Sequence, residues 1–120
     1  MSKVYCQVYR TENHRLIADQ VEVACSFFSR LRGLLGRTKM TAGSGLILQP
    51  CSSIHCFGMR FPIDAIFLDR QHRVITIKEN MPPCSWASQE LAYSVLELCA
   101  GEARKHQISV GEQLKLFYLS

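Results

Sequence analysis

The sequence predicts a β-rich α+β domain built on a largely antiparallel, curled or barrel-like sheet of about seven short strands, with one or two short helices. Its 120 residues and apolar share of 48% are typical of one globular domain, so we expect residues 1–120 to form a single domain. Short apolar runs alternate with turn residues along most of the chain, whereas helical spacing is confined to one segment. So many short strands rarely leave their edges open, and we therefore expect the sheet to curl.

A hairpin and a short helix are expected in the first third of the chain. Residues 4–9 are rich in residues that favour strands, and the polar residues 12–15 predict a turn. Residues 20–24 alternate valine with polar side chains, as the partner strand would. From residue 26 to residue 36 apolar residues recur at helical spacing and glycines follow, which predicts a short amphipathic helix.

The strongest hairpin signal lies in the middle of the chain. Residues 63–68 and 73–78 are two strand-like runs joined by the polar residues 69–72. We expect Asp69 and His72 to serve this turn rather than any chemistry.

Four further elements complete the predicted sheet and its connections. Residues 46–49 form a short strand before a proline, and residues 92–100 and 113–118 form two more strands. Residues 101–106 predict a short turn of helix. The proline-containing residues 81–86 predict a loop, because each proline removes a backbone donor and fixes its own φ angle.

Charge and hydropathy exclude several classes of partner. The formal net charge is +4, but the cationic side chains are scattered, so we expect no nucleic acid partner. The chain lacks a run of eighteen apolar residues, and its first residues do not resemble a signal peptide. We therefore expect a soluble, cytoplasmic protein with no membrane partner.

Six cysteines in such a compartment predict free thiols rather than a disulfide framework. Cys6 and Cys99 each lie inside an apolar run, which predicts that they are small buried hydrophobes.

The segment from Pro50 to Asp64 is the densest in chemically active side chains, and it leads directly into the apolar segment 65–69. We expect its polar groups to be held at the end of a rigid core strand. This segment and three others carry a family resemblance: Arg32-Gly33-Leu34-Leu35-Gly36-Arg37, Gly45-Leu46, His55-x-Phe57-x-Met59-x-x-Pro62-Ile63-Asp64-x-x-Phe67-Leu68-Asp69 and Val95-Leu96-Glu97-Leu98-x-Ala100-Gly101.

Over roughly residues 15 to 118 the chain resembles the domain-of-unknown-function family 192, also called uncharacterised protein family 0127. The resemblance implies a compact β-rich fold and no agreed activity. Cys56 stands near a position where family members often carry threonine.

Two chemical hypotheses compete for the central segment. Cys51, His55, Cys56 and Met59 are soft metal ligands. On a straight strand, however, Cys51, His55 and Met59 would face the same side and lie about 13 Å apart at each step of four residues. Paired Cys-x-x-Cys ligands are absent from the sequence, so we expect no bound metal and no cofactor.

The second hypothesis is a thiol-dependent enzyme. Cys51 or Cys56 would be the nucleophile and His55 the base, with Asp64 orienting the imidazole. It requires the thiol and the imidazole to come within hydrogen-bond reach.

The favoured interpretation is a non-catalytic module that binds a small molecule or a protein partner. Aromatic, thioether and charged side chains are the usual lining of such a site. We predict the following lining residues: Cys51, His55, Phe57, Met59, Arg60, Asp64 and Trp86.

Overall fold

The structure is a computed structural model, and it describes residues 4–24, 41–55, 61–83 and 85–119. Within them lie the strands β1 (Val4–Arg10), β2 (Leu16–Ala24), β3 (Ser44–Leu48), β4 (Ser53–His55), β5 (Ile63–Leu68), β6 (Val74–Met81), β7 (Trp86–Ser88), β8 (Ser94–Cys99) and β9 (Leu114–Leu119), and the helix α2 (Glu102–Lys105). The predicted helix at residues 26–36 lies outside the described residues.

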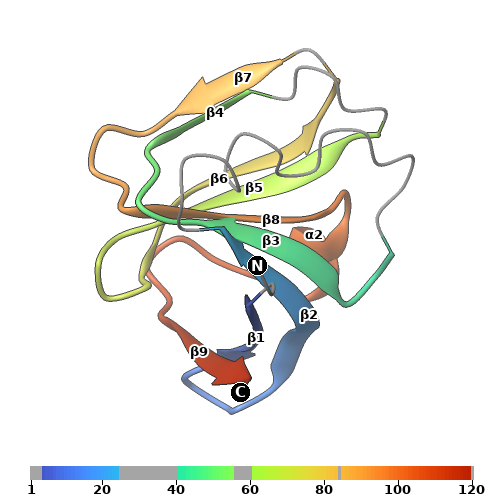
Figure 1. Ribbon diagram of the computed structural model, residues 1–120, viewed down its shortest axis with the longest axis vertical. Coiled ribbons are helices and arrows are strands. Elements are labelled where there is room, and N and C mark those ends of the chain that lie inside the picture. The colour runs from blue at the N-terminus through green and yellow to red at the C-terminus, as the bar shows by residue number, and fades with distance from the viewer. Residues whose placement is uncertain (1–3, 25–40, 56–60, 84, 120) are drawn as a thin grey trace.

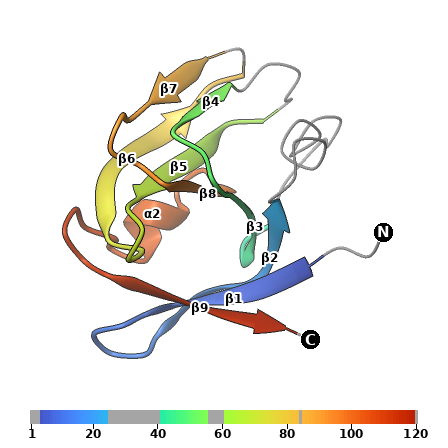
Figure 2. The same ribbon diagram turned by 60° about the vertical axis from the view of Figure 1, so that its left-hand side comes forward.

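Seven of these strands form one strongly curled sheet (Figures 1 and 2). The strand order is β6-β5-β8-β3-β2-β1-β9, with β2 and β3 parallel and the other neighbours antiparallel. An isolated bridge between Arg73 and Gln113 brings the two edge strands together at one end only. The prediction of a β-rich fold is therefore confirmed, but the sheet is mixed and stays open rather than closing into a barrel.

A separate two-stranded sheet, which the sequence did not predict, pairs β4 with β7. Residues 86–88 form a strand directly after the predicted proline-rich loop, and residues 53–55 form its partner. Each strand has three residues, too few for an alternating pattern to be recognised in sequence. Ile54 and Ala87 are their buried positions.

The predicted hairpin between β5 and β6 is confirmed. One carboxylate oxygen of Asp69 accepts hydrogen bonds from the backbone N–H groups of Gln71, at 2.8 Å, and Arg73, at 2.9 Å. His72 takes a φ of 63°, the left-handed conformation that glycine would otherwise supply. The two polar residues therefore replace a glycine-based turn, as expected for Asp69 and His72.

Strand β5 is the centre of the fold because all six of its residues are buried. Ile66 and Leu68 belong to a hydrophobic cluster that includes Ala103 of α2 and Ile108. Phe67 faces a second cluster that the β4–β7 sheet covers with Ile54 and Ala87. In Figure 2, α2 and the β4–β7 sheet lie on opposite sides of β5 and β8.

Candidate functional site

Asp64 organises the end of β5 through its carboxylate. The side chain is fully buried, and Oδ1 accepts a hydrogen bond from the backbone N–H of Asn80 at 2.8 Å. Oδ2 accepts from the backbone N–H groups of Gly101 at 3.0 Å and Ala103 at 2.9 Å. The carboxylate thus joins the end of β6 to the start of α2, and its three hydrogen-bond donors in the described residues are all backbone N–H groups. Its role in this arrangement is to fix the frame around the site.

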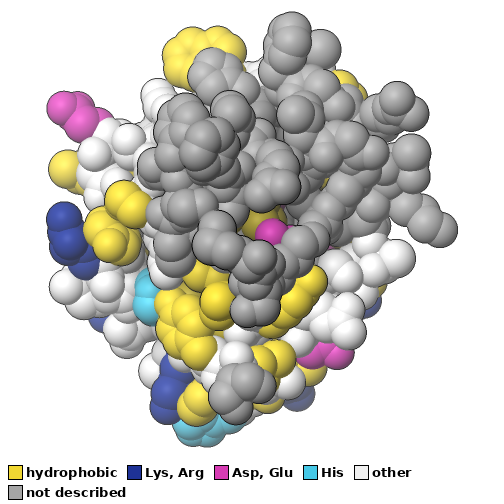
Figure 3. Space-filling view, viewed as in Figure 1, with side chains coloured by type: hydrophobic (Ala, Val, Ile, Leu, Met, Phe, Trp, Pro, Cys, Tyr) yellow, Lys and Arg dark blue, Asp and Glu magenta, His cyan; other side chains and the backbone are white. Residues whose placement is uncertain are grey.

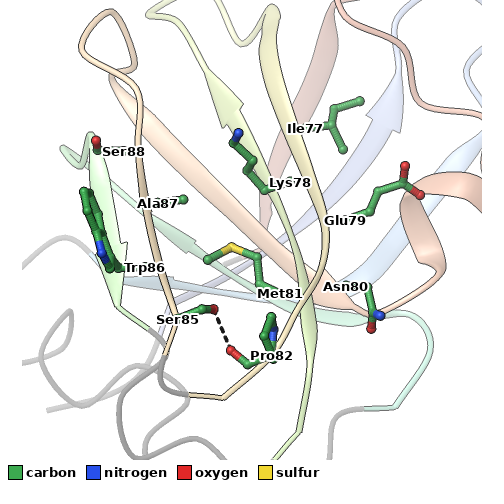
Figure 4. Close-up of a pocket in the computed structure, with 10 residues that line it drawn as sticks. All are labelled: Ile77, Lys78, Glu79, Asn80, Met81, Pro82, Ser85, Trp86, Ala87 and Ser88. Atoms are coloured by element: carbon green, nitrogen blue, oxygen red, sulfur yellow. Dashed lines mark hydrogen bonds between the residues drawn. The ribbon is translucent and has the colours of Figure 1, made fainter.

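A groove of about 470 Å³ lies beside that frame, between β6 and β7 (Figure 4). Met81 is 6% exposed and forms part of the floor, and the Trp86 side chain, 66% exposed, stands at the rim. Figure 4 shows Lys78 and Met81 extending from β6 toward β7, with Ile77 and Glu79 on the other side of the strand. The groove combines an apolar floor with polar groups at its margins.

The groove runs along the outer margin of β6 rather than over one face of the strand. Six successive residues, 77–82, line it, and successive side chains of a strand point to opposite faces. β6 is an end strand of the seven-stranded sheet. At one end the hydrogen bond from Gln89 Nε2 to Thr76 Oγ1, 2.9 Å long, joins the two sides of the groove.

The two charged side chains at the groove, Lys78 and Glu79, differ in whether an opposite charge lies beside them. Glu79 Oε1 lies 3.4 Å from Arg104 Nε, so the carboxylate has a cation beside it. Lys78 is exposed, and in the described part of the chain it has no ion pair. Among the described residues, the groove therefore offers the Lys78 ammonium as a positive charge without an ion pair.

The predicted segment 51–60 reaches the groove through β4. His55 lies opposite Trp86 in the β4–β7 ladder, and Ser53 lies opposite Ser88. The carbonyl of Ser52 accepts a hydrogen bond from the N–H of Gln89 at 2.8 Å. Residues 51–55 therefore run alongside the strand that forms one wall of the groove.

Several predicted site residues lie outside what the structure describes. These are Cys56, Phe57, Met59 and Arg60, and at His55 the description covers the backbone alone. Trp86 is at the groove and Asp64 is in the frame behind it. The structure thus brings Trp86 and the backbone of His55 together, while the convergence of Cys51, His55 and Met59 remains a prediction.

Three thiols lie within the described segments: Cys51 is hydrogen-bonded, and the surroundings of Cys6 and Cys99 raise the thiol pKa. The Cys51 Sγ atom donates to the carbonyl of Ser53 at 3.0 Å, a bond that uses the thiol proton. Burial raises the pKa of the Cys6 thiol to about 11. For Cys99, burial first and then the nearby carboxylates of Glu102 and Asp64 raise the thiol pKa. Cys6, Cys51 and Cys99 form no disulfide.

The described residues hold neither a cluster of metal ligands nor a helix that could span a membrane. Among them no three His, Cys, Asp or Glu side chains gather as a metal site would require. None of the helices described there is long and apolar enough to cross a membrane.

Sequence reasoning missed Lys78 as a site residue and treated Met81 as the start of a loop. Both positions depend on β7 lying over the end of β6, and a three-residue strand leaves no periodic signal. The available signal was local: Met81 and Trp86 flank the two prolines, a spacing that places two large apolar side chains on either side of a turn.

Comparisons with known proteins agree on the fold. A crystal structure from Sinorhizobium meliloti 1021, named as a candidate transcription regulator, is 24% identical with a TM-score of 0.81, over 96% of this chain and 94% of that one. A protein of unknown function from Novosphingobium aromaticivorans DSM 12444 is 23% identical with a TM-score of 0.79, over 94% and 84% of the two chains.

None of the curated proteins matches the sequence significantly. The model of the DUF192 family, described as Uncharacterized ACR, matches residues 8–116, which is most of the chain and agrees with the resemblance in the sequence motifs. The chain therefore belongs to the DUF192 family.

Proposed function

We propose that the chain is a non-catalytic binding module whose ligand lies in the groove between β6 and β7, next to segment 51–60. The observation that carries this proposal is the pairing of a buried Met81 floor with an exposed Trp86 rim in a groove of about 470 Å³. Concave sites with an apolar lining and a few polar groups are the usual form of small-ligand sites. Thioether and indole groups both favour contact with apolar or aromatic ligand groups.

The expected ligand carries an aromatic or aliphatic group and an anionic group. The first would rest on Met81 in the floor, with Trp86 at the rim of the groove. The second would lie near the Lys78 ammonium, which lacks an ion pair among the described residues, whereas Glu79 is already beside Arg104. A cation attracts an anion more strongly beside a partly dry groove than in open water, because the effective dielectric constant is lower there.

The Cys51 hydrogen bond supports binding over thiol catalysis. A thiol acts as a nucleophile in its deprotonated form. The bond from Cys51 Sγ to the Ser53 carbonyl uses the proton that a thiolate lacks, so it favours the neutral thiol.

The test uses three probes of one shape: 4-phenylbutyrate, 4-phenylbutanol and 4-phenylbutylamine. At roughly 0.3 kcal/mol for each of about twelve non-hydrogen atoms, the anionic probe should bind with a Kd in the millimolar range. Backbone amide chemical shifts should change in a saturable way at residues 77–82 and 85–88. Trp86 is the single tryptophan, so its fluorescence reports the same binding.

The variants separate the two contacts. Met81→Ala and Trp86→Ala should weaken all three probes, whereas Lys78→Gln should weaken 4-phenylbutyrate alone and remove its advantage over the alcohol. Leu91→Ala is the matched control, because Leu91 is 77% exposed and outside the groove. Shifts that do not saturate, or that saturate at other residues, would refute the proposal.

A further inference from the structure

The two edge strands of the sheet differ in how well they are protected from pairing with another strand. An unprotected edge presents unpaired backbone groups and pairs readily with a strand of another chain. β6 contains two register shifts against β5 and carries exposed charges at Lys78 and Glu79. Bulges and charges of this kind are common ways to blunt an edge.

Strand β9 has no bulge, and Lys115 is its single charged side chain. Its six residues pair with β1 in an unbroken register, from Arg10 opposite Leu114 to Tyr5 opposite Leu119. Phe117, Tyr118 and Leu119 are 47%, 53% and 47% exposed. Figure 3 shows hydrophobic side chains gathered over the area of β1 and β9. In the described part of the sheet β9 pairs with β1 alone.

The hydrogen bonds at the start of β9 determine which backbone groups point outward. Gln113 accepts from the N–H of Thr11 and so faces β1, while the N–H of Leu114 donates to His72 on the other side. Backbone groups of successive residues in a strand alternate between its two sides. Leu116 and Tyr118 therefore direct their N–H and C=O groups away from β1, toward the open edge.

We propose that this edge pairs with β9 of a second copy of the chain, antiparallel and about a two-fold axis at Phe117. In that register Leu116 of each copy faces Tyr118 of the other, and each such pair exchanges both of its N–H···O bonds. This is the pairing that uses both outward residues, because the Leu114 N–H is already bonded to His72.

The same register keeps the two Lys115 charges apart. Lys115 lies opposite Leu119 of the second copy, so the two Lys115 side chains stand about four residues, roughly 13 Å, apart along the sheet. The two Phe117 residues meet in a non-hydrogen-bonded pair, where Cα atoms are about 4.5 Å apart and side chains are closest. A two-fold interface of this kind is self-complementary, so a second copy supplies all the required groups.

Sedimentation velocity in about 150 mM salt, over a range of protein concentrations, tests the proposal. We expect a species of twice the 13.6 kDa chain mass that dissociates on dilution. Tyr118→Pro should raise the dissociation constant at least about tenfold, because proline removes an N–H that points to the open edge and leaves the β1 ladder intact. Phe117→Lys should do the same by placing two cations at the axis. Leu91→Lys is the control for a charge at an exposed apolar position.

Cysteine cross-linking checks the register independently of the two variants. Oxidation with diamide should join two Phe117→Cys chains, because their Cα separation is within the range that a disulfide spans, and should not join Lys115→Cys chains. Peptide mapping identifies the bridge among the native thiols. A chain that stays monomeric at all concentrations, a dimer unaffected by Tyr118→Pro, or equal cross-linking at positions 117 and 115 would each overturn the proposal.

Discussion

Replacing Asp64 with asparagine should destabilise the fold strongly, although the two side chains have nearly the same shape. The carboxylate accepts three backbone hydrogen bonds in a site with no solvent exposure. An asparagine side chain has one oxygen and one NH₂ group. If its oxygen faces Gly101 and Ala103, its NH₂ group faces the N–H of Asn80, and two donors then point at each other in a dry site.

The magnitude follows from these contacts. A hydrogen bond to a charged group contributes about 1.5–3 kcal/mol, and a buried donor left without a partner costs about 1–3 kcal/mol. The variant loses one charged bond outright and keeps the other two with a neutral acceptor. We therefore expect the free energy of unfolding to fall by about 2–4 kcal/mol, which lowers the Tm of a domain of this size by roughly 10 °C.

Urea and thermal unfolding, followed by circular dichroism and by Trp86 fluorescence, measure this loss. Hydrogen exchange should accelerate most at the amides of Asn80, Gly101 and Ala103. The matched control is Asp69→Asn, because Asp69 also accepts two backbone N–H bonds but does so in an exposed turn. That variant should lose about 0.5–1 kcal/mol. An Asp64→Asn variant as stable as this control would refute the assigned role of the buried carboxylate.

The other two predictions concern thiols. The free energy of unfolding should fall as the pH rises from 9 toward 11, because the native pKa of Cys6 is about 11 and the unfolded chain loses its thiol proton first, near 9. Urea titrations of Cys6→Ala should lack that part of the decline, and an unchanged pH slope would contradict the explanation. Cys51 should react slowly with iodoacetamide at pH 7, and His55→Ala should leave its rate unchanged, because its proton is bonded to Ser53. Rapid alkylation that disappears in His55→Ala would instead establish an activated Cys–His pair.

The long elements of the fold were predictable because their patterns are long. Residues 63–68 are buried on both faces, residues 65–68 among them are a continuous apolar run, and the following turn carries Asp69, a typical turn residue. The parallel pairing of β2 with β3 was not predictable in the same way. It depends on where the chain returns after residue 24, and alternation within a strand does not determine the direction of its neighbour.

The location of the site was predictable from the sequence, but the roles and identities of its residues were less so. The density of polar residues near Asp64 correctly indicated the end of a rigid core strand, but the carboxylate serves the backbone of β6 and α2. Trp86 was predictable from the sequence because it is the single tryptophan and follows two prolines, although the structure places it in β7 rather than in a loop. Lys78 was missed because its place at the groove depends on tertiary packing of a three-residue strand.

The position of the groove follows from the burial of β5. A strand that is apolar on both faces needs a cover on each side, and here α2 covers one face and the β4–β7 sheet the other. The second cover is short, with three residues in each strand, and it contributes Ile54 and Ala87 to the core. The β4–β7 sheet is therefore too short to cover all of the apolar surface beside β6, and Met81 is left at the floor of a groove.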